Sequence, residues 1–235
     1  GTCKGLVKIA SLPALSSAYT VAKAWIGLAV LPTTGYTADA YLYAHEALAG
    51  WSQTTVTWNN RPNCDDKHLD YVLIQKGVSE AKSVRLDITN LVRKWYASSA
   101  DNFGVMLDSH EGQPIELCTS ENTTYDATAH PVIYVNYISN AGLEDYLTYE
   151  TFGAGRAGTA YMALHSGNLV VSRGLTAMNG NRLPVSLGLT WNACNKDVNS
   201  FGVGKGWRLN WNQNLRRDQP ATGDYTYVLT DGDGT

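Results

Sequence analysis

The chain has 235 residues, 44% of them hydrophobic, which is enough to bury one large core or two smaller ones. Its formal net charge of -3 argues against a nucleic-acid-binding protein, which would normally carry a basic patch. No run of about 18 apolar residues occurs, so we expect no insertion into a membrane. The 14 Tyr and 7 Trp, against 3 Phe, favour strands and exposed recognition faces over helices.

The spacing of cysteine and histidine gives no sign of a metal site. Cys3, Cys64, Cys118 and Cys194 lie far apart in the sequence and lack the C-x-x-C pairs of zinc sites. The five His are scattered and form no H-E-x-x-H motif. We therefore expect no metal, no other cofactor and no cysteine nucleophile, and the cysteines can be either paired or free.

Residues 20–137 have the pattern of short strands separated by turns. The alternation of Val84, Leu86 and Ile88 with polar residues predicts a half-buried strand. The period then changes over 89–96, where Thr89 is expected to cap a short helix that places its apolar residues on one face. Many short strands and one brief helix are typical of a β-sandwich or jelly roll. The predicted strands are 23–30, 40–43, 54–58, 83–88, 103–107, 115–118 and 132–137.

Placement at every second position across these strands predicts one common core within residues 20–138. In the strand predicted at 54–58, Trp58 alternates with Val56 and is expected to be buried, so truncation to alanine would cost about 3–5 kcal/mol. The side chains expected in the core are Trp25, Val56, Trp58, Leu86, Ile88, Val92, Trp95, Val105, Leu107 and Val135.

Beyond a predicted junction at 139–142, the pattern is one of β-hairpins. Turn dipeptides occur at 167–168 and 179–180, next to strand patterns at 169–171 and 185–189. The whole chain is therefore expected to be all-β.

A G-x-G-x-x-G spacing is formed by Gly153, Gly155 and Gly158. A dinucleotide site also needs a helix after the glycines and an acid about 20 residues on. The segment between the glycines and the turn at Gly167 is too short for that helix, and residues 151–196 contain no Asp or Glu. We predict no bound nucleotide here, and an extended rather than helical segment at 159–165.

The segment 231–234, Asp-Gly-Asp-Gly, is similar to the start of a calcium loop. Such a loop needs a third oxygen ligand two residues on and a later bidentate acid, and the sequence stops before either can be checked. A hairpin turn is the favoured interpretation, with calcium as the alternative.

Four segments of the first half resemble the DNRLRE domain. They are 51–62 (WSQTTVTWNNRP), 84–95 (VRLDITNLVRKW), 102–107 (NFGVML) and 131–137 (PVIYVNY). This jelly-roll family is similar to carbohydrate-binding modules and occurs on secreted and surface bacterial proteins. The resemblance implies that residues 1–138 form such a β-sandwich, although the family's usual first strands are missing.

The second half resembles the opening region of an RHS/YD-repeat protein. The resemblance rests on 142–147 (GLEDYL), 155–161 (GRAGTAY), 166–170 (SGNLV), 183–187 (LPVSL), 206–210 (GWRLN) and 231–235 (DGDGT). It implies that 139–235 are the truncated start of a β-shell that encloses a C-terminal cargo, often a polymorphic toxin. The sequence contains neither the repeats proper nor the family's self-cleavage site nor a cargo.

Together the two resemblances imply a fragment of a large secreted or cell-surface bacterial protein. A non-catalytic, glycan-binding sandwich would bind cell-wall or extracellular polysaccharide and lead into the shell and cargo of the same chain. One alternative is a sandwich that binds nothing and only spaces or docks the shell. A polysaccharide lyase is the third hypothesis, because jelly rolls can host that chemistry, but fold alone does not supply its base.

The candidate glycan-binding residues are Trp51, Trp58, Arg61, Tyr41 and Tyr43. An indole packs well against the C–H face of a pyranose, and Arg61 can donate to sugar hydroxyls or to an acidic glycan. The two tyrosines lie on one face of their strand, opposite to Leu42.

Each candidate also has a purely structural interpretation. Trp58 can belong to the core, and Trp51 can fill a corner. Residues 59–62 can form a simple turn that leaves Arg61 on the surface. Tyr41 and Tyr43 can form a partly solvent-exposed face that packs against neighbouring residues and binds no ligand.

Overall fold

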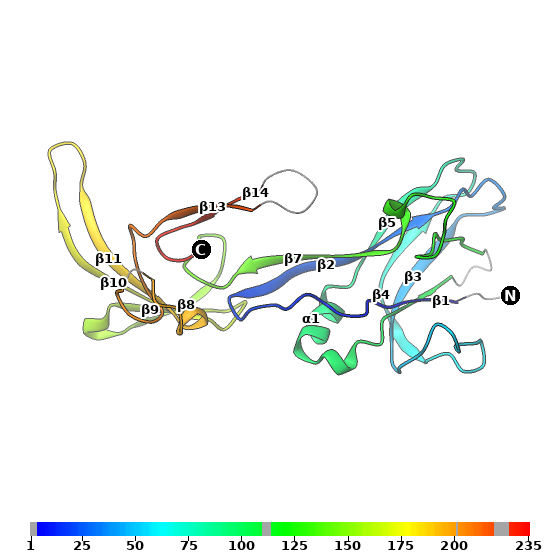
Figure 1. Ribbon diagram of the computed structural model, residues 1–235, viewed down its shortest axis with the longest axis horizontal. Helices are drawn as coiled ribbons and strands as arrows, with labels where there is room; N and C mark the ends of the chain where they lie inside the picture. Colours follow the sequence, from blue (N-terminus) through cyan, green and yellow to red (C-terminus); the bar gives the residue numbers. More distant parts are fainter. Residues whose placement is uncertain (1–3, 110–113, 201, 219–225) are drawn as a thin grey trace. The chain divides into compact units, whose positions relative to one another are not determined.

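The computed structural model describes residues 4–109, 114–200, 202–218 and 226–235 (Figure 1). The chain divides into two compact units, one made of Gly1–Ala14 and Val21–Tyr137, the other of Leu15–Thr20 and Ile138–Thr235. Nearly all regular structure in the described residues is antiparallel β-strand, which confirms the all-β prediction. No helix in this described part is long and apolar enough to cross a membrane.

The first unit is a β-sandwich of two antiparallel sheets (Figure 1). Side chains at alternate positions of both sheets point into a shared core. The four-stranded sheet has the order β1 (Lys4–Val7), β6 (Val105–Asp108), β3 (Ala40–Ala47) and β4 (Cys64–Ile74). The three-stranded sheet has the order β5 (Lys82–Asp87), β2 (Tyr19–Val30) and β7 (Val132–Ser139).

The core of the sandwich contains most of the side chains predicted for it. Trp25, Val56 and Val135 are only half-buried. Trp58 is 51% exposed, so its assignment to the core is wrong. The predicted residues that are buried are Leu86, Ile88, Val92, Trp95, Val105 and Leu107.

Two predicted strands do not form. Residues 54–58 belong to a series of turns. Because this segment is not part of a sheet, the alternation of Val56 and Trp58 does not place them on the inner face of a strand. Residues 115–118 contribute one isolated bridge, between Leu117 and Val30, instead of a strand. The predicted strands at 23–30, 40–43, 83–88, 103–107 and 132–137 are confirmed in β2, β3, β5, β6 and β7.

Two strands of the first unit were not predicted. The strand β4 escaped detection because the residues at its start are polar and most of them are exposed. It is nevertheless paired with β3 along most of its length. The short strand β1 pairs with β6 at an edge of the same sheet.

The α-helix α1 (Thr89–Ala97) packs on the core through its apolar face. Leu91, Val92 and Trp95 are buried, as the helical spacing predicts. Thr89 does not cap the helix, because it is already the first helical residue and the cap position is Ile88.

The hydroxyl of Thr89 instead connects the start of the helix to two strands. It accepts a hydrogen bond from the Ala24 amide of β2 at 3.0 Å and donates to the Asp87 carboxylate at 2.6 Å. The Thr89 amide also donates to Asp87, at 2.8 Å. Partial burial acts to raise the pKa of Asp87, but these hydrogen bonds and the Lys23 ammonium outweigh it and lower the pKa below 3.8.

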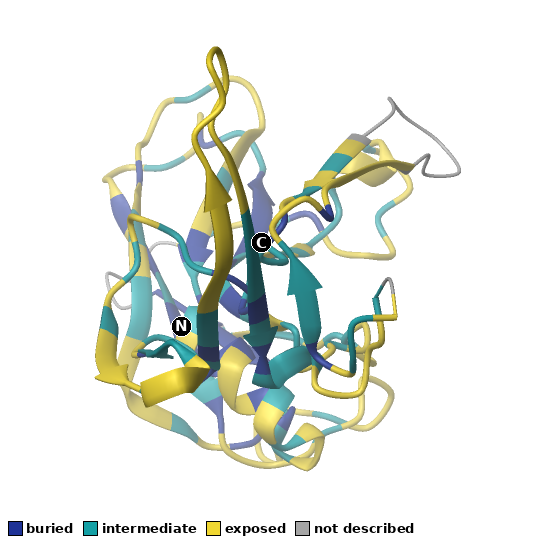
Figure 2. Cartoon of the chain, turned by 90° about the vertical axis from the view of Figure 1, so that its left-hand side faces the viewer, coloured by how far each residue is buried: buried dark blue, intermediate teal, exposed yellow. Residues whose placement is uncertain are grey.

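The second unit contains a five-stranded sheet and a separate two-stranded ribbon. The outer halves of β10 and β11 form an exposed hairpin, which Figure 2 shows in yellow. The sheet order is β12 (Trp207–Leu209), β11 (Val185–Asn192), β10 (Leu169–Met178), β9 (Thr159–Ala163) and β8 (Tyr149–Gly153), and the ribbon pairs β13 (Asn214–Asp218) with β14 (Thr226–Thr230).

The glycine motif forms the tight connection between β8 and β9. Residues 155–157 make one 3-10 turn, and β9 follows it directly, so the expected extended segment is confirmed over Thr159–Ala163. Gly158 has a φ of 105°, and a Cβ there would overlap the carbonyl oxygen of Ser172. The glycine therefore permits a close backbone approach inside the sheet.

Buried asparagines hold the second unit together. Asn192 is fully buried, accepts a hydrogen bond from the Gly142 amide at 2.6 Å and donates to the Asp233 carbonyl at 2.8 Å. The Asp233 carboxylate accepts from the amides of Leu143 at 2.7 Å and Thr235 at 3.0 Å. The Asp233 carboxylate therefore has a structural role, because it connects parts of the unit that are distant in the sequence.

We predict that Thr89→Val lowers the free energy of unfolding by about 1–2 kcal/mol, because a buried amide and a carboxylate both lose a hydrogen-bond partner. The pKa of Asp87 is lowered in the fold, so the stability linked to it is present above the ordinary carboxyl pKa and is lost as the pH falls below about 4. The cost of Thr89→Val should therefore shrink at acid pH. Denaturant unfolding at pH 7 and pH 3 measures both effects.

Thr34→Val is the matched control, because Thr34 is exposed. Equal stabilities of the two variants at pH 7 would contradict this account of Thr89.

Candidate functional site

A cluster of rings lies on the outer face of the β3–β4 pair. The strand register places Tyr43 opposite Tyr71 and Tyr41 opposite Leu73, so their side chains share one face of the sheet. The ring of Tyr71 lies 5.7 Å from Tyr41 and 5.8 Å from Tyr43, between centroids. His68 joins the cluster, 5.5 Å from Tyr43 and 5.4 Å from Tyr71. We call Tyr41, Tyr43, His68 and Tyr71 the aromatic face.

The aromatic face is a consequence of how β3 builds the core. Ala40, Leu42 and Ala44 point inward and are buried, which leaves Tyr41 and Tyr43 on the outside. This confirms that the two tyrosines lie opposite to Leu42. Tyr71 is 52% exposed and Tyr41 is 36% exposed, so the cluster offers ring surface to solvent.

An ion pair lies beside the rings on the neighbouring strands. Asp108 of β6 is opposite Tyr43 on one side and Lys4 of β1 on the other. The Lys4 ammonium is 3.0 Å from the Asp108 carboxylate, whose side chain is only 2% exposed. The face therefore combines ring surfaces with a fixed pair of charges.

The sequence did not predict His68 and Tyr71, because both lie on the undetected strand β4. The signal that was available is the run of 68–74 (HLDYVLI), in which Tyr71 and Leu73 alternate with inward-pointing residues. The polar residues before it concealed the pattern.

Trp51 lies away from these rings in the described structure. Its indole N–H donates to the Phe103 carbonyl at 2.8 Å, and the half-buried ring lines a cleft of about 370 Å³. Other walls of the cleft come from Leu6, Leu117 and Pro131, with Glu121 at the surface. Trp51 therefore has two roles: its ring lines the cleft, and its hydrogen bond to Phe103 holds the loop in place.

Trp58 and Arg61 form a separate pair on an exposed loop. The Arg61 guanidinium lies 4.0 Å from the centre of the Trp58 ring, which is a cation–π contact. The loop is closed by Asn60, whose side chain donates to the Thr55 carbonyl at 2.9 Å and accepts from the Thr57 hydroxyl at 2.9 Å. The structure thus distributes the five candidate residues over three places, and only Tyr41 and Tyr43 lie together in a larger cluster.

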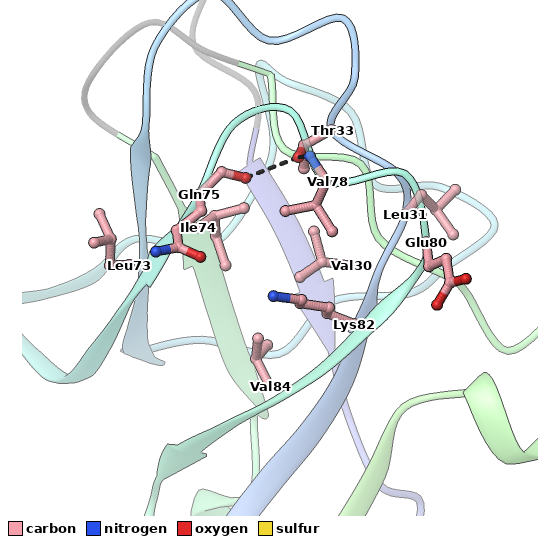
Figure 3. Close-up of a pocket in the computed structure, with 10 residues that line it drawn as sticks. All are labelled: Val30, Leu31, Thr33, Leu73, Ile74, Gln75, Val78, Glu80, Lys82 and Val84. Atoms are coloured by element: carbon pink, nitrogen blue, oxygen red, sulfur yellow. Dashed lines mark hydrogen bonds between the residues drawn. The ribbon is translucent and has the colours of Figure 1, made fainter.

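A small cavity at one end of the sandwich is a poor candidate. It has a volume of about 70 Å³ and lies between Val30, Ile74 and Val84. Figure 3 shows the Lys82 side chain pointing into it, below the hydrogen bond from the Thr33 hydroxyl to the Gln75 carbonyl at 2.8 Å. Ligand pockets usually measure about 300–1,000 Å³, so this cavity cannot hold a sugar ring.

The described residues contain no group of three or more His, Cys, Asp or Glu side chains that could hold a metal ion. Asp231 and Asp233, the alternative calcium ligands, lie in a turn that the Gly234 amide closes on the Asp231 carbonyl at 3.0 Å. Cys64, Cys118 and Cys194 are free thiols, and Cys3 lies outside the described residues.

Comparison with known families gives one match. Residues 11–133 match the model of carbohydrate-binding module family 96, which is more than half of the chain. The matched range contains all five candidate residues as well as His68 and Tyr71. It ends before the region that resembles an RHS/YD-repeat protein. A search of curated proteins found no match.

The exposure of Trp58 leads to a comparison of two tryptophans. We predict that Trp58→Ala lowers the free energy of unfolding by less than about 1 kcal/mol, because a surface ring and one exposed cation–π contact are lost. Trp95 is only 2% exposed, so Trp95→Ala should lower the free energy of unfolding by about 3–5 kcal/mol. Denaturant unfolding of the two variants checks the difference, and equal costs would show that Trp58 is part of the core.

Proposed function

The chain belongs to carbohydrate-binding module family 96, and from this premise we propose that its first unit is a non-catalytic module that binds polysaccharide through the aromatic face. The observation that carries the proposal is the exposure of several rings, held in fixed positions, on one sheet of the matched region. Buried ring clusters are common in cores, whereas exposed ones indicate recognition.

The chemistry of the aromatic face suits a sugar chain. The C–H face of a pyranose packs against an aromatic ring, and the tyrosine hydroxyls provide hydrogen bonds to sugar oxygens. The partly exposed ammonium of Lys4, held in place by the buried Asp108 carboxylate, adds a hydrogen-bond donor at the border of the rings. Because the rings lie on an open sheet, a chain can pass over them and extend on both sides.

The proposed setting is a secreted or cell-surface bacterial protein. The second unit would begin an RHS-type shell around a cargo, and the first unit would attach that protein to cell-wall or extracellular polysaccharide. Support comes from the ribbon of β13 and β14, where Leu215 is 66% exposed and lies opposite Leu229, which is 63% exposed. Stacked β architectures bury such apolar faces under neighbouring repeats.

A lyase is less well supported than a binding module. Neutralising a uronate requires an arginine or lysine next to a tyrosine or histidine base. The ammonium of Lys4, on the sheet of the aromatic face, is already paired with Asp108. Release of unsaturated products from a polyuronate would nevertheless establish that activity.

We predict that Tyr41→Ala and Tyr71→Ala each weaken polysaccharide binding about 2- to 10-fold, since an aromatic contact contributes about 0.5–1.5 kcal/mol. Affinity electrophoresis in gels containing β-glucan, xylan, galactomannan or polygalacturonate measures the loss. Tyr146→Ala is the matched control, because Tyr146 is 72% exposed and lies in the second unit.

Two outcomes would contradict the proposal. Failure of all four polysaccharides to retard the native protein would favour the alternative of a spacer that binds nothing. Retardation that is unchanged in the Tyr41→Ala, Tyr71→Ala double variant would place the binding surface elsewhere.

The shell proposal predicts a difference between this chain and a longer one that continues past Thr235 into the proposed shell. The present chain should bind a dye specific for exposed apolar surface and should be cut by proteases within 195–235, because its apolar strand faces are uncovered. The longer chain should suppress both. A present chain that is monomeric, protease-resistant and dye-silent would show that the second unit is complete without a shell.

A further inference from the structure

A second ring cluster lies on the outer face of the three-stranded sheet in the first unit. Trp25 of β2 and Tyr134 of β7 are stacked, with ring centroids 5.6 Å apart and an interplanar angle of 22°. The guanidinium of Arg85, on β5, lies 5.3 Å from the centre of each ring. One side chain from each strand of the sheet thus contributes to a single cluster.

A glycine in the middle strand makes this arrangement possible. The register pairs Gly27 with Arg85 and Trp25 with Asp87, so Gly27 is the next residue after Trp25 on the outer face. A Cβ at Gly27 would lie 2.9 Å from the Cε2 atom of Tyr134, closer than real Cβ contacts allow. The Tyr134 ring therefore crosses over β2 at the one position that has no side chain.

A groove continues from the ring of Tyr134 along the sheet. Its floor is Gly27 and Ala29 of the central strand, and its sides include Ser83 of β5 and Val132 of β7. The volume is about 200 Å³. Gly27 and Ala29 leave the central strand with almost no side chain on this face, which hollows the sheet between Ser83 and Val132.

We propose that this groove, together with the adjoining cluster of Trp25, Arg85 and Tyr134, is a second polysaccharide-binding site. The inference rests on the proposed function, because it assigns the same class of ligand to a different surface. It adds that the module is bivalent and holds two separate chain segments.

The side chains of the groove and of the adjoining ring cluster have complementary roles toward a sugar. Tyr134 is 42% exposed and offers ring surface to the C–H face of a pyranose. The Arg85 guanidinium, oriented by the two rings, presents N–H donors to hydroxyl and ring oxygens. The Ser83 hydroxyl is exposed on the opposite part of the groove and can donate or accept.

The size of the groove fits part of a chain. Its volume of about 200 Å³ is below the range of about 300–1,000 Å³ that encloses a drug-sized ligand. A groove of this size takes only a short part of a sugar chain, and the rest of the polysaccharide extends into solvent.

The two sites cannot share one short segment. The aromatic face and the groove lie on the outer surfaces of the two sheets, and the core of the sandwich separates them. Simultaneous occupancy therefore joins two chains, or two distant parts of one chain, and raises the apparent affinity for long polysaccharides by making the second contact intramolecular.

The test combines variants of both surfaces. The Arg85→Ala, Tyr134→Ala double variant removes the groove's recognition groups, and Ser83→Tyr fills the groove from an exposed position without changing the core. The Tyr41→Ala, Tyr71→Ala double variant removes the other site. Affinity electrophoresis in the same four polysaccharides measures retention, and the turbidity of each dissolved polysaccharide after addition of protein measures cross-linking.

We expect each surface variant to weaken retention about 2- to 10-fold, in line with the loss of one or two aromatic contacts. Combining the variants of both surfaces should abolish retention. Only the native protein should cross-link a polysaccharide, because cross-linking needs both sites.

The outcomes separate this inference from the proposed function. One outcome would overturn the second site and leave the aromatic face as the binding site. In it, the groove variants are retained in the gels and cross-link polysaccharide like the native protein, while the Tyr41→Ala, Tyr71→Ala variant loses all binding. Loss of all binding in the groove variants alone would assign binding to the groove and overturn the aromatic face. Absence of retention of the native protein in every gel would overturn both.

Discussion

The alternation of side chains along a β-strand is the constraint on which the functional surfaces of this protein depend. In β3 the inward residues Ala40, Leu42 and Ala44 build the core, and this fixes Tyr41 and Tyr43 on the outside. The same rule in β2 buries Ile26 and Leu28 and turns Trp25 and Gly27 outward. The core therefore determines where the rings lie, so no separate scaffold is needed to present them. Surfaces held in this way lose little conformational entropy when a ligand binds.

The sequence predicted those elements whose local pattern agrees with their final environment. The strand β5 and the helix α1 were found because Val84, Leu86 and Ile88 alternate and because Leu91, Val92 and Trp95 follow the helical period. The strand β4 was missed, since its first half is polar and it acquires its structure by pairing with β3. As a result, two of the four rings of the aromatic face were predicted and two were not. The opposite error occurred at Trp58, where a strand was predicted and none forms. The alternating pattern there lies in a loop that Asn60 closes by hydrogen bonds.

In the second unit, structure depends on contacts that no local pattern reveals. Asn192 bonds to the Gly142 amide, 50 residues earlier, and to the Asp233 carbonyl, 41 residues later. Buried amides of this kind must be fully paired, since an unsatisfied polar group in the interior costs about 1–3 kcal/mol. The sequence suggested a calcium loop as one alternative for 231–234, but the structure gives Asp233 a role within the fold. The exposed apolar residues of β13 and β14 are the feature that connects this unit to the shell proposal.

The central claim is that outward-facing rings of the sandwich bind polysaccharide, and side-chain NMR tests it most directly. Ring signals of the native protein would be followed during titration with soluble oligosaccharides of β-glucan, xylan, galactomannan and polygalacturonate. The account predicts that at least one of them shifts the signals of Tyr41, Tyr43 and Tyr71, while the buried ring of Trp95 does not move. Titrations in which no ring responds, or in which the responding residues all lie within 138–235, would contradict it.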